Sequence, residues 1–394
     1  MDKVVIVGGC GHVGLPLALV IADLGYECVA LDKSQETVGI VNSGQMPFEE
    51  EGASELLEKC LSSGNFWATT EPESLKTAEV VIVVVGTPID EHLNPDPNAV
   101  VDAFLECMPF MNSNQLVILR STVFPGVTGK VIELLKTHNL FPEVTFCPER
   151  ILEGRAIREL RELPQIIGAN TETGAAKASL FFLSFGIETL VVTPEEAELA
   201  KLFTNVWRYI KFAAANQFWI MSNEAGLDFA KIRNVITFDY ERAADLPGAG
   251  FAAGPCLFKD TMQLAAFSNN NFILGHSAML VNEGLPLYVA TKIGEKFDLA
   301  NKTIGILGAA FKGESDDVRS SLSYKLKKIL LFKAKAVLMT DPYVTSDTSL
   351  SPLDYVLEES DILLIATPHY EYRKIESNKP VIDIWNLLGK GSKV

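Results

Sequence analysis

A glycine-rich segment near the start of the chain has the spacing of a phosphate-binding turn. Gly9-Cys10-Gly11-His12-Val13-Gly14 follows the β-branched run Lys3–Val7 and precedes a helical pattern over Leu15–Leu24. Glycines at these positions permit a tight turn and let the backbone approach a pyrophosphate, while the helix directs free N–H groups at the anion. The segment therefore predicts a dinucleotide site. FAD fits the same fingerprint, although no other motif points to a flavin.

Two further side chains extend this site. Asp32 ends the second predicted strand, Cys28–Leu31. A carboxylate there accepts hydrogen bonds from an adenosine ribose and repels a 2′-phosphate, which favours NAD over NADP. Thr87 follows the apolar run Val80–Val85. Because ligands bind beyond the carboxyl ends of parallel strands, Thr87 is a predicted cofactor contact, with a plain turn as the alternative.

A cysteine in the second half of the chain has neighbours suited to reactivity. Cys256 follows residues 248–255, which are mostly small, so a substrate could approach it closely. Lys259 and Asp260 come soon after it, and a nearby cation favours the thiolate form of a cysteine, which is the nucleophile. The alternative is a buried cysteine that packs as a small apolar residue.

Two pairs of polar residues are spaced for one face of a helix. Lys201 and Asn205 are separated by one helical turn, so an amine and an amide could together stabilise a developing oxyanion. Glu149 and Glu153 have the same spacing at a passage from strand to helix, so they share a face if this segment is already helical, and a carboxylate there could activate a water molecule. A solvated polar surface is the alternative for both pairs.

Composition narrows the class of protein. The chain has 394 residues, with 34 lysines and arginines against 50 aspartates and glutamates, and a formal net charge of −16. We therefore expect no nucleic-acid or membrane partner held by the overall field. The six cysteines form no CxxC pair and the five histidines form no HExxH motif, so we expect no metal site. Reduced thiols and the lack of a signal-peptide pattern predict a cytoplasmic protein.

The order of apolar runs predicts an α/β protein. Short strand-like runs alternate with helical patterns up to Val192, which is typical of a parallel sheet covered by helices on both faces. From Pro194 the sequence reads as helical, and a second strand–helix alternation begins at Thr303. We expect a dinucleotide-binding domain over residues 1–193, a helical connector over 194–299 and a smaller α/β domain over 300–394.

Five segments, in order along nearly the whole chain, resemble motifs of the UDP-glucose/GDP-mannose dehydrogenase family. They are Ser121–Gly126, Pro148–Gly154, Lys201–Asn205, Gly254–Asp260, and Phe311–Lys312 with Asp316–Ser320. The resemblance implies an N-terminal Rossmann domain, a dimerising helical connector and a C-terminal Rossmann-like domain that holds the nucleotide of the substrate. It also implies an NAD-dependent, four-electron oxidation of the C6 alcohol of a UDP-sugar to a carboxylate, a GDP-sugar being less favoured, by a homodimer.

The resemblance also assigns roles to single residues. It implies that Cys256 forms a thiohemiacetal and then a thioester, and that Lys201 and Asn205 stabilise the oxyanion. It makes Glu149 the general base, with Glu153 binding or orienting the substrate. The remaining residues are Thr122 and Asp260 beside the catalytic water, Lys259 at the cofactor, and Lys201, Lys312, Arg319 and a neighbouring subunit's Arg242 at the substrate.

The chain departs from the family pattern in ways that leave the sugar open. The segment Gly250–Pro255 is one residue longer and poorer in glycine than usual, and His12 replaces a common tyrosine. Pro148-Glu149-Arg150 resembles members that act on N-acetylhexosamines such as UDP-N-acetylmannosamine, whereas Leu152-Glu153-Gly154 resembles those that act on UDP-glucose. The alternatives in function are a two-electron β-hydroxyacid-type dehydrogenase and a non-catalytic NAD-binding protein.

Overall fold

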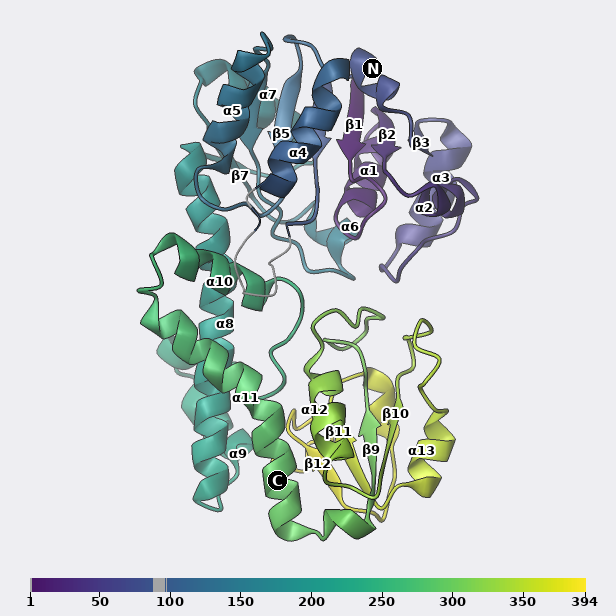
Figure 1. The fold of residues 1–394 in the computed structure, drawn as a ribbon, viewed down its shortest axis with the longest axis vertical. Helices are drawn as coiled ribbons and strands as arrows, with labels where there is room; N and C mark the ends of the chain where they lie inside the picture. The colour runs from purple at the N-terminus through teal and green to yellow at the C-terminus, as the bar shows by residue number, and fades with distance from the viewer. Residues whose placement is uncertain (1, 88–95, 97) are drawn as a thin grey trace. The chain divides into compact units, whose positions relative to one another are not determined.

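The computed structural model describes residues 2–87, 96 and 98–394. The chain forms two compact units, Met1–Thr204 and Asn205–Val394, each with its own sheet (Figure 1). This arrangement confirms the predicted α/β class.

The first unit contains an eight-stranded sheet in which all neighbouring strands are parallel except β6 and β7. The exception departs from the parallel sheet expected from the sequence. β3 was also not predicted, because it is a four-residue strand with only half of its side chains buried. In spatial order the strands are β3 (Phe66–Thr69), β2 (Glu27–Leu31), β1 (Lys3–Val7), β4 (Val80–Val83), β5 (Leu116–Leu119), β6 (Glu143–Phe146), β7 (Gln165–Ala169) and β8 (Thr189–Val192).

Helices cover both faces of this sheet. Because successive strand residues point to opposite faces, Val4 and Ile6 pack in one core with α1 and α7, while Val5 packs in a second core with α4 and α5. This double burial accounts for the continuous apolar runs of the central strands. The helices are α1 (Gly14–Asp23), α2 (Gln35–Asn42), α3 (Ala53–Ser63), α4 (Asn98–Cys107), α5 (Val127–Thr137), α6 (Ala156–Glu159) and α7 (Glu172–Leu183).

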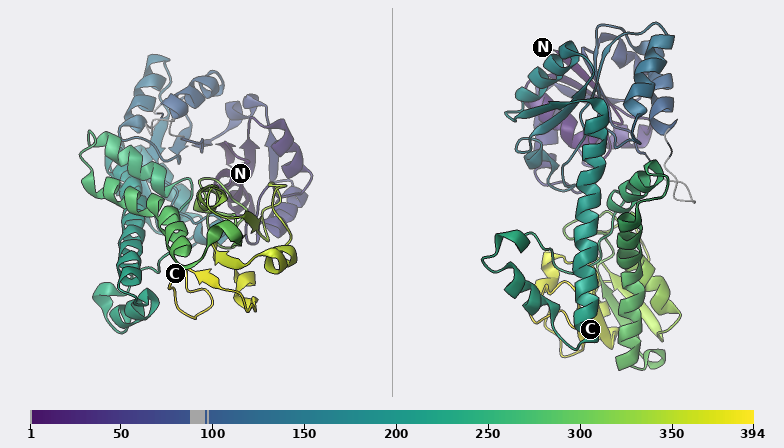
Figure 2. Two further views of the ribbon diagram at one scale, coloured as in Figure 1. Left: turned by 60° about the horizontal axis from the view of Figure 1, so that its bottom comes forward. Right: turned by 90° about the vertical axis from the view of Figure 1, so that its left-hand side faces the viewer.

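The second unit begins within the long helix α8 (Pro194–Glu224). The predicted helical region is confirmed by α9 (Phe229–Thr237), α10 (Leu257–Phe267) and α11 (Ile273–Lys296). Figure 2 shows α8 and α11 running alongside each other. Their side chains Trp219 and Leu285 share a core with Ile304 of the second sheet, so these helices cover one of its faces.

The second sheet is four-stranded and parallel. Its strands in spatial order are β10 (Ala336–Thr340), β9 (Thr303–Leu307), β11 (Ile362–Ile365) and β12 (Val381–Asp383), with α12 (Leu322–Leu331) and α13 (Leu353–Glu359) between them in sequence. β12 has three residues and was not predicted. Short 3₁₀ turns are η1 (Pro72–Thr77), η2 (Met108–Phe110), η3 (Glu241–Ala243), η4 (Leu299–Asn301) and η5 (Tyr370–Lys374).

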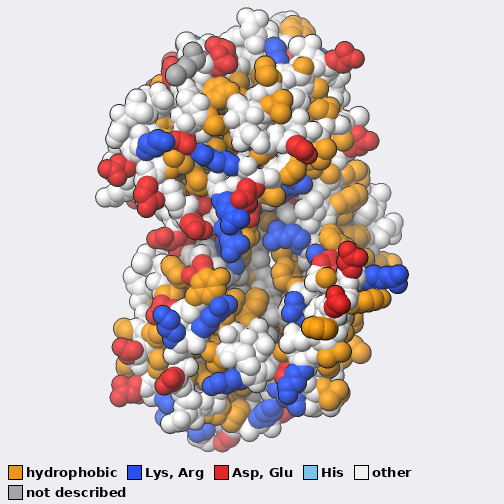
Figure 3. All heavy atoms as spheres, turned by 180° about the vertical axis from the view of Figure 1, so that it is seen from behind, with side chains coloured by type: hydrophobic (Ala, Val, Ile, Leu, Met, Phe, Trp, Pro, Cys, Tyr) orange, Lys and Arg blue, Asp and Glu red, His pale blue; other side chains and the backbone are white. Residues whose placement is uncertain are grey.

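The described helices include none that is both long enough and apolar enough to cross a bilayer. The face of the molecule in Figure 3 carries acidic, basic and apolar side chains that are largely interspersed.

Candidate functional sites

The predicted dinucleotide turn lies between β1 and α1, and close packing requires glycine at two of its positions, Gly9 and Gly14. A Cβ built on Gly9 would lie 2.6 Å from the Cα of Ala30, and one on Gly14 would lie 2.2 Å from the carbonyl oxygen of Gly8. A Cβ on Gly11 would meet only that carbonyl, at 3.7 Å. No side chain caps the start of α1, so this helix N-terminus is left to interact with an anion. The turn therefore fits a pyrophosphate.

Asp32 lies beside the turn, as the sequence predicts. Its carboxylate accepts hydrogen bonds from the backbone N–H of Cys10 at 3.1 Å and of Ser34 at 3.2 Å. These bonds hold the carboxylate at the end of β2, where it could accept hydrogen bonds from a ribose of the cofactor. His12 stacks on Phe48 with ring centroids 4.1 Å apart, so this residue of the turn also supports the loop before α3.

The structure brings Thr87 and Thr122 together. The hydroxyl of Thr87 donates to the carbonyl of Thr122 at 2.7 Å, and the N–H of Val85 donates to the Ser121 hydroxyl at 2.8 Å. These loops follow the adjacent parallel strands β4 and β5, so they share an edge of the sheet with the glycine turn. Both threonines thus lie on the carboxyl side of the sheet, where ligands of such folds bind.

Glu149 is held by a buried arginine that sequence reasoning did not single out. Arg120, which is 2% exposed, donates to one oxygen of Glu149 and, at 2.9 Å, to the amide oxygen of Gln165. The other oxygen of Glu149 accepts the N–H groups of Arg150 at 2.7 Å and Ile151 at 3.0 Å. Burial opposes ionisation, but the charge and hydrogen bonds around the carboxylate outweigh it and lower the pKa of Glu149.

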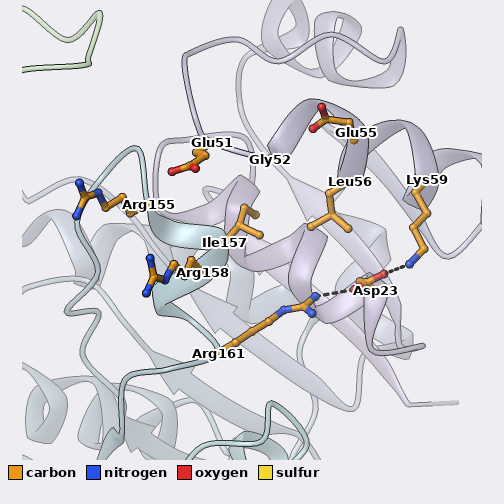
Figure 4. A pocket seen from close by; sticks show the side chains of 10 residues that line it. All are labelled: Asp23, Glu51, Gly52, Glu55, Leu56, Lys59, Arg155, Ile157, Arg158 and Arg161. Carbon is orange, nitrogen blue, oxygen red and sulfur yellow. Dashed lines mark hydrogen bonds and ion pairs between the residues drawn. The ribbon is translucent and has the colours of Figure 1, made fainter. Parts of the chain in front are cut away.

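The segment after Glu149 is anchored by carboxylates. The N–H groups of Gly154 and Ala156 donate to Glu50 at 2.7 and 2.6 Å, next to the half-buried Glu153. Farther along, Arg161 pairs with Asp23 at 2.5 Å (Figure 4). The Arg161–Asp23 pair borders a cavity of about 480 Å³ that none of the sequence-predicted site residues lines. Arg155 and Arg158, from the segment that follows Glu153, also line this cavity.

Lys201 is buried on the first part of α8, and Glu198 lies one turn before it. Glu198 accepts hydrogen bonds from the N–H of Gly126 at 2.6 Å and from the N–H and hydroxyl of Thr128 at 2.9 and 2.6 Å. It therefore caps the start of α5, and burial raises the pKa of Glu198. Glu198 was not predicted, although it ties the helix of Lys201 to the segment that follows Thr122.

Cys256 is the only exposed cysteine, and all six lie among the described residues. It stands at the start of α10, where the helix N-terminus favours a negatively charged thiolate. Cys10 lies in the phosphate turn, but burial, with a smaller contribution from Asp32, raises the pKa of its thiol to about 12, which disfavours a thiolate there. Burial likewise raises the pKa of Cys147 to about 12 and those of Cys60 and Cys107 to about 11.

Three of the predicted residues meet at Asp260, one helical turn after Cys256. Asp260 is fully buried and accepts hydrogen bonds from the amide of Asn205 at 2.5 Å and from the ammonium of Lys259 at 2.6 Å. The ammonium of Lys259 thus pairs with a carboxylate of its own helix. Asp260 orients both side chains.

In the C-terminal sheet, the loop after β9 repeats the plan of the first turn. Asp341 follows β10 and accepts the N–H groups of Ala309 at 2.7 Å and Ala310 at 3.0 Å. It also pairs with the fully buried His369 at 3.0 Å. Burial opposes ionisation, but His369 and the backbone amides outweigh it and lower the pKa of Asp341. Both oxygens of the Asp341 carboxylate thus accept hydrogen bonds from protein groups.

Two of the predicted substrate cations, Lys312 and Arg319, lie in the loop that follows β9, and a third, Arg242, lies in the helical part of the second unit. The Nζ of Lys312 lies 5.9 Å from the centre of the Phe311 ring. The Arg319 side chain is half exposed and forms an ion pair with Asp317. Its Nε donates to both carboxylate oxygens of Asp317, each at 2.9 Å. Arg242 is exposed on η3. The described residues include no cluster of metal-ligating side chains.

Three domain descriptions of one family match the chain in order. The NAD binding domain of the UDP-glucose/GDP-mannose dehydrogenase family matches residues 2–185, its central domain 195–283 and its UDP binding domain 305–390.

Individual relatives agree with this match. A UDP-N-acetyl-D-mannosamine dehydrogenase of Pyrococcus horikoshii is 31% identical over 98% of this chain and 92% of its own length. The solved structure of a UDP-D-ManNAc dehydrogenase from Pyrococcus horikoshii has a TM-score of 0.89 and 30% identity, covering 95% of this chain and 91% of that one. A UDP-glucose dehydrogenase structure from Pyrobaculum islandicum has a TM-score of 0.90 and 26% identity, covering 97% and 94%.

Proposed function

Because this chain belongs to the UDP-glucose/GDP-mannose dehydrogenase family, we propose that it oxidises the C6 alcohol of a UDP-sugar to the uronate through covalent catalysis by Cys256. The chain is an NAD-dependent oxidoreductase of nucleotide sugars. The observation that carries the covalent step is the exposure of Cys256 at a helix N-terminus, while the other five cysteines are buried.

The thiol resolves the problem of oxidising an aldehyde to an acid. NAD, when bound, supplies the hydride acceptor for both oxidations. The Cys256 thiolate adds to the aldehyde carbon, forming a C–S bond, and the oxygen takes a proton to give a thiohemiacetal. Loss of a hydride from that carbon and of the hydroxyl proton leaves a thioester. Water then adds, the C–S bond breaks, and the carboxylate and the free thiol are released.

Polar side chains on each unit suit the other steps. Asn205, oriented by the buried Asp260, and Lys201 would stabilise the developing oxyanion. With its lowered pKa and occupied oxygens, Glu149 is better suited to fix charge and orientation than to accept a proton. We therefore propose that Glu153, with Thr122, acts on the hydrolytic water. Cations in the C-terminal domain would bind the diphosphate of the substrate: Lys312 and Arg319.

For the sugar, we propose UDP-N-acetylmannosamine, because relatives at up to 31% identity over nearly the whole chain carry that name. The test compares UDP-glucose, UDP-N-acetylglucosamine, UDP-N-acetylmannosamine, UDP-N-acetylgalactosamine and GDP-mannose as substrates. We expect two NADH per UDP-N-acetylmannosamine oxidised. One NADH per substrate would instead indicate a two-electron dehydrogenase, and binding without turnover would indicate a non-catalytic protein.

The cofactor preference predicts a specific response to substitution at Asp32. Asp32→Ala should raise the KM for NAD about tenfold, because hydrogen bonds to a charged group are worth about 1.5–3 kcal/mol. The same change should narrow the preference for NAD over NADP, since the repulsion of a 2′-phosphate is lost. Steady-state kcat/KM values for both cofactors measure this. Asp23→Ala, which removes a carboxylate at the far end of α1, is the matched control. An unchanged cofactor ratio in Asp32→Ala would contradict the assignment.

We also propose that the enzyme is a cytoplasmic homodimer. Large apolar side chains on α8 are more than two-fifths exposed, including Trp207, Phe218 and Met221. Such a row needs a partner surface, and the exposed Arg242 would be available to the partner's substrate. A reducing compartment would keep Cys256 usable. Light scattering should give twice the mass of the chain, whereas a monomeric mass would contradict the dimer.

A further inference from the structure

We propose that Asn216 is a positioning residue which, together with Asn282, fixes the segment that presents Cys256. The inference rests on the proposed role of Cys256 as nucleophile. Asn216 lies on α8 and Asn282 on α11, and both side chains are 0% exposed. Neither residue belongs to a motif that the sequence resemblance assigned to the reaction.

Asn216 binds both polar groups of one backbone residue. Its Oδ1 accepts the N–H of Gly250 at 2.9 Å, and its Nδ2 donates to the carbonyl of Gly250 at 3.0 Å. The same Nδ2 donates to Oδ1 of Asn282 at 2.9 Å, and Asn282 in turn donates to the carbonyl of Tyr209 at 3.1 Å. The orientation of the Asn216 amide is therefore determined, because a reversed amide would set donor against donor and acceptor against acceptor.

Two buried amides between helices are costly unless they are satisfied, and apolar side chains could fill the same space. A satisfied polar network is the kind of contact that specifies one backbone path. Here the network holds the backbone of Gly250, which is the start of the segment that leads into α10. The amide pair thus selects where that segment leaves the α8–α11 core.

The rest of the segment has little freedom to absorb a shift at Gly250. A Cβ on Gly250 would lie 2.2 Å from the ring of Trp385, and one on Gly254 would lie 2.7 Å from the ring of Phe311. Phe251 and Ala252 between them are buried. In a close-packed region a displacement is passed along the chain, and the next residue in the path with reactive chemistry is Cys256.

The test measures the thiol directly as well as turnover. In Asn216→Ala we expect kcat/KM for the UDP-sugar to fall by about tenfold to a hundredfold, the cost of misplacing a reacting group by about an ångström. The KM for NAD should stay within about twofold. The rate at which iodoacetamide alkylates Cys256 should change several-fold, with Cys256→Ser as the blank for other thiols.

Asn223→Ala is the matched control, because Asn223 lies on the same helix and its side chain bonds backbone groups of Trp219 and Val394. It should lower the melting temperature without changing alkylation or kcat/KM. Asn282→Leu leaves Asn216 and Gly250 in place, so it should change kcat/KM and the alkylation rate in the same direction but by less. This variant provides the test if Asn216→Ala does not fold. A double-mutant cycle between positions 216 and 282 should be non-additive.

The outcomes separate this inference from the proposed function. Turnover that survives in Cys256→Ser would overturn the covalent mechanism and with it the inference. If Cys256→Ser is inactive while folded Asn216→Ala keeps normal alkylation and kcat/KM, the mechanism stands and the positioning role is wrong. Equal losses in Asn216→Ala and Asn223→Ala would also overturn it, because they would reflect stability alone.

Discussion

Replacement of Cys256 with serine should lower the steady-state formation of uronate by at least about a thousandfold, as expected when a covalent nucleophile is removed. A hydroxyl lacks the ready ionisation of a thiol, so the aldehyde would not be captured as a hemiacetal that can lose a second hydride. Binding of NAD should change little, because its predicted contacts, apart from Lys259, lie in the first unit. Coupled measurement of NADH and uronate gives the stoichiometry of the residual reaction.

Cys60→Ser provides the comparison for this variant. Cys60 is a buried thiol on α3, and its Sγ donates to the carbonyl of Leu19 on α1 at 3.5 Å. Serine there should cost some stability and leave turnover intact. Normal uronate formation by Cys256→Ser would rule out the thioester route and would favour a mechanism in which the aldehyde is oxidised as its hydrate.

The residues that could be predicted from the sequence are those whose evidence is local. The glycine turn, Asp32 and Cys256 each stand within a short motif, and the turn geometry requires glycine where a Cβ would strike Ala30. Their partners come from distant parts of the chain. The residues near Asn216 in sequence do not predict its hydrogen bond to Gly250, because that contact depends on how α8 packs in the second unit.

Electrostatic context was the part least accessible to pattern reasoning. Lys259 was expected to favour a thiolate because it is close to Cys256 in sequence, and the structure adds an ion pair between its ammonium and the fully buried carboxylate of Asp260. Glu149 was expected to accept a proton, yet its pKa depends on a buried arginine at the end of another strand. In both cases the residue type was informative, while its protonation depends on a neighbour in space.

Removal of Arg120 should have the largest effect on stability. Arg120→Met would leave the carboxylate of Glu149, whose side chain is 12% exposed, without its compensating charge. Loss of one partner of a buried ion pair costs about 3–5 kcal/mol. Chemical denaturation at pH 7 measures the change in the free energy of unfolding. Arg158→Met, at an exposed arginine paired with Glu162, is the control and should change stability little.

The pH dependence identifies the cause. In the native protein the pKa of Glu149 is lowered, so its contribution to stability is present above the pKa of the unfolded chain and is lost as pH falls through the folded pKa. In Arg120→Met only burial and the two backbone amides remain, and burial favours the neutral acid. The difference in stability between the two proteins should therefore shrink as pH falls below about 4, the range in which a free glutamate is protonated.

A second substitution separates charge from packing. Arg120→Met combined with Glu149→Leu removes both charges and should recover most of the lost stability, because apolar side chains can replace a buried ion pair at little cost. The same double variant should remain inactive if Glu149 contributes a fixed negative charge to the reaction. A double variant as unstable as Arg120→Met would show instead that the contacts of Arg120 with Gln165 and Phe182 hold this end of the sheet together.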